Sequence, residues 1–255
     1  MPRKFDIIQD SMISVARGDT ANWKMVNKYG RNHDVDTNSV PEDIWGNGGI
    51  WQPLPSPQKV TVVSTRELDS ASGPGARSVK IIGLNALWQE QIELLPLDGL
   101  THVTSVNEFI RIHQVSVNTC GSLGANVGVI TVLGSVNISM QSFIDANYGE
   151  SASSFYTIPE GVTGFMTNLW VSMNQSTASA NATVGLFVRV KADLSDSPLN
   201  LKHVYHASSC CGIAKRDFKP YLVISEKTDI ILKALGVSNN NTDICVGYDL
   251  IMVDN

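Results

Sequence analysis

Residues 34–38 (DVDTN) place oxygen-bearing side chains at alternate positions, as the start of a calcium-binding loop does. An EF-hand also needs a glycine at the sixth position of the loop and a bidentate glutamate at the twelfth, where this sequence has Ser39 and Trp45. A calcium site of another kind would use Asp34, Asp36 and Glu42. We favour turns in which these side chains bond the nearby backbone, so no metal is expected here.

Four zinc-type ligands fall close together at His203, His206, Cys210 and Cys211. In a strand, the two histidines would point to opposite faces, because side chains alternate with a period of two. Adjacent cysteines seldom bind one ion without a distorted backbone. We therefore expect a loop or an edge strand with free thiols, and no zinc.

Catalytic patterns are equally incomplete. Residues 73–77 (GPGAR) have the glycines of a phosphate-binding loop, but a strand follows instead of the required helix, so a hairpin turn is expected. His102 and His113 have no serine or acid at a motif spacing, and no Gly-x-Ser-x-Gly segment occurs. The sequence thus predicts a non-enzymatic protein without a cofactor. A polymer-degrading enzyme stays as an alternative that requires convergent carboxylates, for example Asp34, Asp36, Glu90 and Glu93.

Charge and hydropathy exclude two kinds of partner. With 19 basic and 24 acidic residues, the net charge of −5 argues against direct, non-specific nucleic-acid binding, which needs a concentrated positive field. No run of eighteen apolar residues occurs, so no membrane span is expected. The first residues (MPRKF) lack the pattern of a secretory signal, and the four cysteines are too few for a disulfide framework, so free thiols are predicted.

Apolar and polar residues alternate from Val60 to Val117, between glycine-containing turns at residues 69–75 and 97–100. This period of two is typical of half-buried antiparallel strands. A second series of alternating segments runs from Phe155 to Val253. Short strands joined by polar loops predict an all-β protein with two β-sandwich or jelly-roll-like modules, over residues 58–138 and 139–255. The polar residues 139–154 are the expected seam, with one helical turn near Phe143.

Residues 1–57 show less alternation. Apolar residues at helical spacing in 1–22 allow either a short helix or an extended arm. Residues 23–51 are rich in Gly, Asn, Asp and Trp, and we interpret them as an ordered loop, because three tryptophans are too much apolar area to leave in water. Three prolines in 52–57 predict an extended spacer. The whole of 1–57 is thus an N-terminal arm followed by an ordered docking loop.

Several short segments, taken together, form a pattern that is known from another group of proteins. They are residues 27–32 (NKYGRN), 34–36 (DVD), 42–49 (EDIWGNGG), Ser64 with Asp69, 73–77 (GPGAR), 82–85 (IGLN), Glu93, 97–99 (LDG) and 109–112 (FIRI). In these segments the chain resembles a family of tailed-bacteriophage virion structural proteins that is common in environmental phage genomes. The match is specific over residues 23–132 and looser at 156–161 (YTIPEG) and 226–230 (EKTDI). The chain departs from the family pattern at Pro74 and Asn47, and neither change threatens the fold.

The resemblance implies a capsid-decoration, head–tail or tail component, made in the host cytoplasm and located in the virion. It implies a homo-oligomer that also contacts other capsid or tail subunits. We expect the subunit contacts to come from the arm and docking loop, at Trp23, Tyr29, Trp45 and Trp51. The alternative function is a receptor- or glycan-binding module of a tail or head fibre, in which exposed tryptophans would stack on sugars.

Overall fold

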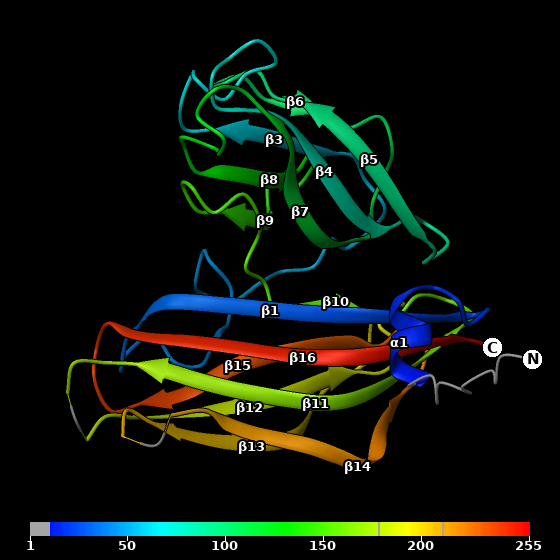
Figure 1. Cartoon of the computed structure of the whole chain (residues 1–255), viewed down its shortest axis with the longest axis vertical. Coiled ribbons are helices and arrows are strands. Elements are labelled where there is room, and N and C mark those ends of the chain that lie inside the picture. The colour runs from blue at the N-terminus through cyan, green and yellow to red at the C-terminus, as the bar shows by residue number, and fades with distance from the viewer. Residues whose placement is uncertain (1–10, 178, 211) are drawn as a thin grey trace, which may run out of the picture.

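The computed structural model describes residues 11–177, 179–210 and 212–255, and antiparallel strands make up most of it. Within those residues there is one helix, α1 (Ser11–Ala16). Two β-sandwiches lie one above the other along the long axis of the molecule (Figure 1). The all-β class predicted from the alternation is confirmed. We call the lower unit in Figure 1 the main sandwich and the upper unit the inserted sandwich.

The main sandwich contains both chain ends of the described fold. One sheet has the order β1-β16-β11-β14, and the other has the order β10-β15-β12-β13, with β2 also pairing with β15. Its core is the layer of alternate apolar side chains between the two sheets, including Met166, Leu232 and Leu250. The strands are β1 (Trp23–Val35), β2 (Glu42–Asp43), β10 (Tyr156–Thr157), β11 (Val162–Asn174), β12 (Asn181–Arg189), β13 (Leu199–Ser208), β14 (Ala214–Ile224), β15 (Asp229–Val237) and β16 (Thr242–Asp254).

The inserted sandwich packs a sheet of order β6-β3-β8-β9 against a sheet of order β5-β4-β7. Its own apolar core includes Val62, Ile81, Phe109 and Ile130. The strands are β3 (Val60–Ser64), β4 (Ala76–Leu84), β5 (Glu90–Pro96), β6 (Val103–Thr104), β7 (Arg111–Cys120), β8 (Ile130–Gly134) and β9 (Met140–Ile144). The chain leaves the main sandwich after β2 and returns to it at β10, so this unit is an insertion between two of its strands.

The turn predicted at residues 69–75 is organised by Asp69, which is fully buried. Its carboxylate accepts hydrogen bonds from the Ser64 hydroxyl (2.7 Å) and from three backbone N–H groups, those of Ala76 (2.8 Å), Val127 (2.9 Å) and Gly128 (2.8 Å). One short acid thus ties three segments of the inserted sandwich together. Buried backbone donors need such an acceptor because water cannot reach them.

The predicted loop over residues 23–51 is wrong in its first part, because residues 23–35 form the thirteen-residue strand β1. This strand pairs with β16 in continuous register from Trp23–Val253 to Asn32–Ile244. β1 lies at the edge of its sheet, so few of its side chains are buried and the alternation is weak in the sequence. Gly30 is required there, since a Cβ would lie 2.6 Å from the backbone nitrogen of Ser154.

Two further expectations change. Residues 11–16 form a helix, one of the two alternatives predicted for the N-terminal arm, whereas residues 1–10 lie outside the described residues. The helical turn expected near Phe143 is instead strand β9, which belongs to the inserted sandwich and moves the seam towards residue 150. β9 was missed because polar Gln141 and Ser142 are buried in it. The Gln141 amide donates to the carbonyl oxygen of Gln52 (2.9 Å), which satisfies part of that side chain.

Candidate functional site

The prediction that Trp45 and Trp51 make subunit contacts is wrong, because the two residues are 2% and 4% exposed within this chain. Trp51 stacks on Phe155 with ring centroids 4.5 Å apart, and Trp45 tilts against the same ring at 5.5 Å. Ile231 of β15 completes the cluster. Both tryptophans therefore stabilise the region where the chain passes between the two sandwiches, and neither side chain is available to a neighbour. The expectation that this loop is ordered by its tryptophans agrees with the packing.

Trp23 and Tyr29 are each 42% exposed on β1. Their side chains lie on the solvent side of the sheet β1-β16-β11-β14, because the alternate residues of the paired strands, such as Leu250 and Met166, lie in the core. The part they were predicted to play in subunit contacts stays a prediction.

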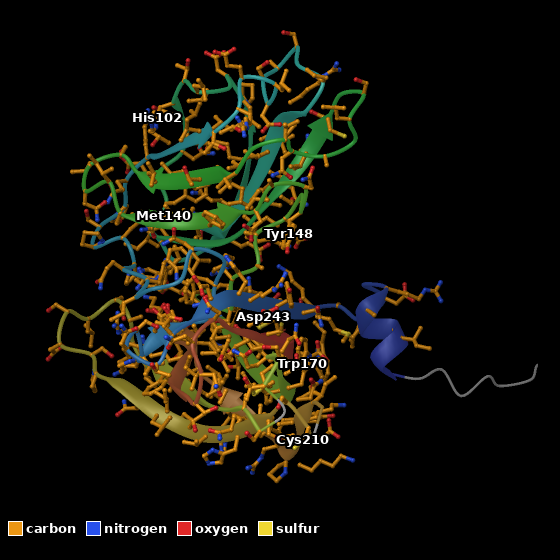
Figure 2. All side chains as sticks on the ribbon, turned by 90° about the vertical axis from the view of Figure 1, so that its left-hand side faces the viewer. His102, Met140, Tyr148, Trp170, Cys210 and Asp243 are labelled. Atoms are coloured by element: carbon orange, nitrogen blue, oxygen red, sulfur yellow. The ribbon has the colours of Figure 1, made fainter. Side chains whose placement is uncertain are left out.

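Neighbouring strands place further apolar residues beside these two. The register puts Met25, Ile251, Phe165 and Val223 in one row across all four strands. We define the outer face as the side of this sheet that faces away from the main core. It bears Trp23, Met25, Tyr29, Phe165, Trp170, Val223, Ile251 and Val253, of which Ile251 is only 3% exposed. Helix α1, which contacts β1, projects from the same side of the molecule (Figure 2).

Specific contacts fix the geometry of the outer face. The Trp170 ring lies across Gly247, where an added Cβ would approach the ring to 2.5 Å. Asp249 accepts hydrogen bonds from the side-chain amides of Asn27 and, at 2.6 Å, of Asn168. These amides bridge three adjacent strands at their outer surface. The polar row of Asn27, Asp249 and Asn168 therefore separates the apolar row at Met25 from the aromatic residues Tyr29 and Trp170.

Two free sheet edges, those of β5 and β14, are protected against pairing with a strand of another molecule. On β5, the Glu93 carboxylate accepts from the backbone N–H groups of Val106 (2.7 Å) and Asn107 (3.0 Å), so a loop lies along that strand. On β14, the register with β11 is broken between Leu222 and Asp217, and the intervening residues include Lys219 and Pro220. Charges, proline and irregular register all hinder edge-to-edge pairing.

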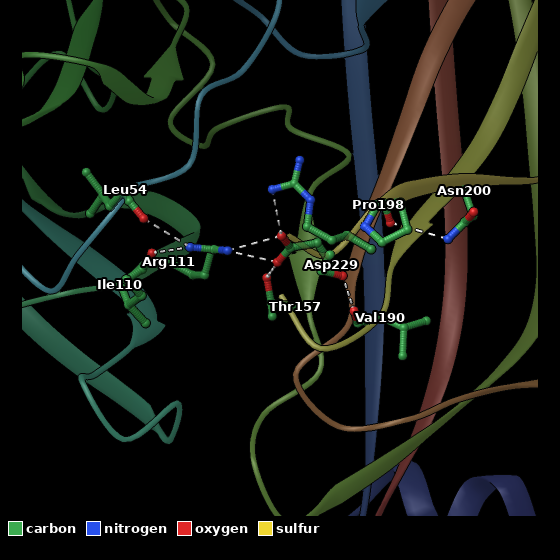
Figure 3. Close-up of polar contacts among 10 residues, drawn as sticks. Leu54, Ile110, Arg111, Thr157, Val190, Pro198, Asn200 and Asp229 are labelled. Carbon is green, nitrogen blue, oxygen red and sulfur yellow. Dashed lines mark hydrogen bonds and ion pairs between the residues drawn. The ribbon is translucent and has the colours of Figure 1, made fainter. Parts of the chain in front are cut away.

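A buried ion pair joins the two sandwiches (Figure 3). Arg111 of β7 donates from Nε and Nη2 to the two carboxylate oxygens of Asp229 in β15, at 3.0 and 3.1 Å. The Thr157 hydroxyl donates to the same carboxylate (2.6 Å). Arg111 also donates from Nη1 to the carbonyl oxygens of Ile110 (2.9 Å) and Leu54 (3.3 Å). Trp88 lies against the guanidinium, 4.9 Å from ring centroid to Cζ, as in a cation–π contact.

A second polar contact between the sandwiches is built on Lys28 and His113, both buried. The Lys28 ammonium donates to the backbone oxygen of His113 (2.7 Å), and burial lowers the Lys28 pKa to about 8 while Glu150 opposes the shift. Nε2 of His113 accepts from the backbone N–H of Thr157 (3.3 Å). Burial, and then the charges of Lys28 and Arg111, hold the His113 pKa well below its usual value. His113 is therefore a neutral structural side chain.

The structure does not assemble the metal or catalytic clusters considered from the sequence. Across the described ranges, no three His, Cys, Asp or Glu side chains lie close enough to hold a metal ion. Asp36 accepts from the backbone N–H of Asn241 (2.9 Å), and Glu42 accepts from the N–H of Gly49 (2.7 Å). These carboxylates thus accept from backbone N–H groups, but neither bond is the local turn predicted from the sequence, because Asn241 is distant in sequence and Gly49 is seven positions from Glu42. Glu90 forms an ion pair with Lys24 at 3.9 Å.

The zinc-type residues are likewise engaged separately. The His203 ring tilts against Phe218 with centroids 5.3 Å apart. Nδ1 of His206 is 3.2 Å from the Thr183 hydroxyl. Cys211 lies outside the described residues. In the part of the chain that the structure describes, no helix is long and apolar enough to cross a membrane.

A cleft of about 690 Å³ opens beside the ion pair, between the two sandwiches. Its walls come from four parts of the chain: the proline-containing residues 50–57, the start of the inserted sandwich's β7 with Trp88, the β12–β13 connection with Arg189, and β15 with Lys233. A cavity of this size is typical of ligand sites. Sequence reasoning missed it, because its lining residues come from separate segments spread between positions 50 and 233.

No family model matches the chain, and no curated protein is similar to it in sequence. Two similar solved structures are one titled as infectious bursal disease virus, Gx strain, and one of a mutant VP2 protein of that virus in derived T=1 particles. The identities are 8% and 11%, the alignments cover 91% of this chain and 81% and 76% of those chains, and the TM-scores are 0.20 and 0.19. Similarity at this level does not establish a shared fold.

Proposed function

We propose that the chain is a non-enzymatic structural protein of a phage virion, which assembles with copies of itself and with neighbouring capsid or tail subunits. The outer face of the main sandwich supports this proposal most directly. It presents Trp23, Met25 and Tyr29, each at least 40% exposed, together with Val223 at 61%. Exposed large apolar side chains gathered on one sheet face commonly mark a protein–protein contact. The resemblance of residues 23–132 to phage virion proteins supports the same assignment.

The exposed apolar side chains of the outer face can contribute a useful free energy of association. Burying a large apolar side chain completely contributes about 1.5–3 kcal/mol, so each half-exposed side chain on the face would contribute about 1 kcal/mol on contact. Four such side chains give about 4 kcal/mol per copy before the costs of association. Repeated contacts in a closed assembly then add to one another, since every subunit uses the same face.

The test replaces two exposed outer-face residues by acids, in the double variant Met25→Asp and Val223→Asp. The two side chains lie at opposite ends of one cross-strand row, so the charges enter the proposed contact on both edge strands of the sheet. A matched control places the same charges at Val106 and Val136, which are 78% and 79% exposed in the inserted sandwich. Sedimentation velocity measures self-association, and quantitative mass spectrometry of purified particles measures incorporation.

We expect the outer-face variant to lose self-association and at least tenfold of its incorporation, while its melting temperature and that of the control stay near wild type. If the outer-face variant enters particles as well as the control does, the proposed contact is wrong. Deleting residues 1–55 is not a suitable test, because that deletion removes strand β1 from the main sandwich.

A further inference from the structure

The cleft between the sandwiches contains a cation whose hydrogen-bonding groups are not used. Arg189, the last residue of β12, lines the cleft and keeps 28% of its side chain exposed. Its Nε is buried and has no hydrogen-bond partner in the described part of the chain. Its one ion pair there is at 3.8 Å, from Nη1 to an oxygen of Asp229. A guanidinium carries five N–H donors, so most of the capacity of Arg189 is unfilled.

Asp229 does not supply the missing acceptors. Its two oxygens already accept from Nε and Nη2 of Arg111 and from the Thr157 hydroxyl. These contacts are hydrogen bonds of 2.6–3.1 Å, whereas the separation from Arg189 exceeds hydrogen-bond range. Arg111 and Asp229 neutralise each other, and Arg189 has no other ion pair among the described residues.

A second unused donor belongs to the same cleft. Trp51 lines it, and the indole Nε1–H of Trp51 is buried without a partner among the described residues. Lys233, also in the lining, forms an ion pair with Asp43. The lining carboxylate Asp193 pairs with Lys227 at 3.4 Å. Among the charged lining groups, Arg189 is therefore the cation without a hydrogen-bonded acid in the described part of the chain, and a ligand that pairs with it has to supply acceptors.

We propose that this cleft binds an oxyanion, either the carboxylate of an acidic sugar or a phosphate group, with the guanidinium of Arg189 as its main partner. A planar guanidinium pairs with two oxygens of a carboxylate or phosphate at once, which gives both affinity and orientation. The apolar lining around it, which includes Trp88, Ile110 and Leu194, accommodates the body of an organic ligand. This site is separate from the outer face, so the result of its test does not depend on the proposed virion contact.

The experiment titrates the full-length chain with inorganic phosphate, with glucuronate and with neutral glucose. Isothermal calorimetry gives the affinities, and the indole N–H resonances of the ¹⁵N-labelled protein report on Trp51, whose signal is assigned with Trp51→Phe. Arg189→Gln removes both the positive charge and the planar set of N–H donors. Arg189→Lys keeps the charge but removes the planar set of donors. Arg66→Gln, at an exposed arginine of the inserted sandwich, is the matched control.

We expect at least one of the two anions to bind and to shift the Trp51 indole resonance, while glucose does not. Arg189→Gln should weaken binding at least about tenfold, the typical effect of losing a charge-assisted hydrogen bond, and Arg189→Lys should weaken it less. Arg66→Gln should leave binding unchanged. The anion that binds more tightly shows whether the cleft prefers a carboxylate or a phosphate. The proposal is overturned if neither anion binds, or if the affinity is the same in wild type and Arg189→Gln with an unchanged melting temperature.

Discussion

Replacing Arg111 by methionine removes one half of the buried ion pair that joins the two sandwiches. The side chains of Arg111 and Asp229 are 4% and 1% exposed, so the carboxylate left behind cannot regain its hydration. It would keep the Thr157 hydroxyl and the distant Arg189, and the carbonyl oxygens of Ile110 and Leu54 would lose their donor. Breaking a buried pair in this way costs about 3–5 kcal/mol of the free energy of unfolding.

The double variant Arg111→Met with Asp229→Asn separates the cost of an unpaired charge from the cost of changed packing. Each single variant is expected to lose about 3–5 kcal/mol, and the double variant is expected to lose clearly less than their sum, because both fully buried charges of the pair are then removed while Arg189 keeps part of its side chain in solvent. Urea unfolding followed by fluorescence and by circular dichroism measures both quantities. Since the pair connects β7 to β15, the single variants should also separate the transitions of the two sandwiches.

Arg31→Met is the control. Arg31 makes a similar bidentate pair with Asp243, at 2.9 and 2.7 Å, but both side chains are partly exposed. A pair of this kind contributes about 1 kcal/mol or less. The reasoning is refuted if Arg111→Met costs no more than Arg31→Met, or if the two single effects simply add in the double variant.

Two further predictions concern the junction and the inserted sandwich. Because burial beside Lys28 and Arg111 lowers the pKa of His113, the unfolded chain binds a proton at a higher pH than the folded chain does, so stability should fall as the pH drops below about 6.5. Below that pH, His113→Gln should reduce the dependence of the free energy of unfolding on pH by up to about 1.4 kcal/mol per pH unit, as measured by urea unfolding. An unchanged pH dependence would contradict this. Asp69→Ala leaves three buried backbone donors without their acceptor and should cost about 3 kcal/mol or more in the same assay. Asp98→Ala, in an exposed turn, should cost under about 1 kcal/mol, and equal losses would show that the Asp69 bonds contribute little.

The sequence determined the class of the fold, because alternation with a period of two is a local property that each strand carries by itself. Residues 60–64 and 76–84 alternate as half-buried strands must, and the structure has β3 and β4 there. The same argument fails for β1 and β9, which lie at or near sheet edges and bury polar side chains such as Asn32 and Gln141. The hydrophobic pattern of those segments depends on neighbours that the local sequence does not reveal.

Tertiary structure alone decided which residues meet. Four tryptophan and tyrosine positions were equivalent as contact candidates in the sequence, but Trp45 and Trp51 pack on Phe155 inside the chain while Trp23 and Tyr29 face solvent. Arg111 and Asp229 are 118 positions apart, and they pair only because the inserted sandwich docks on the main one. Burial and charge pairing are properties of that docking, since they depend on distances in space that no spacing along the chain encodes.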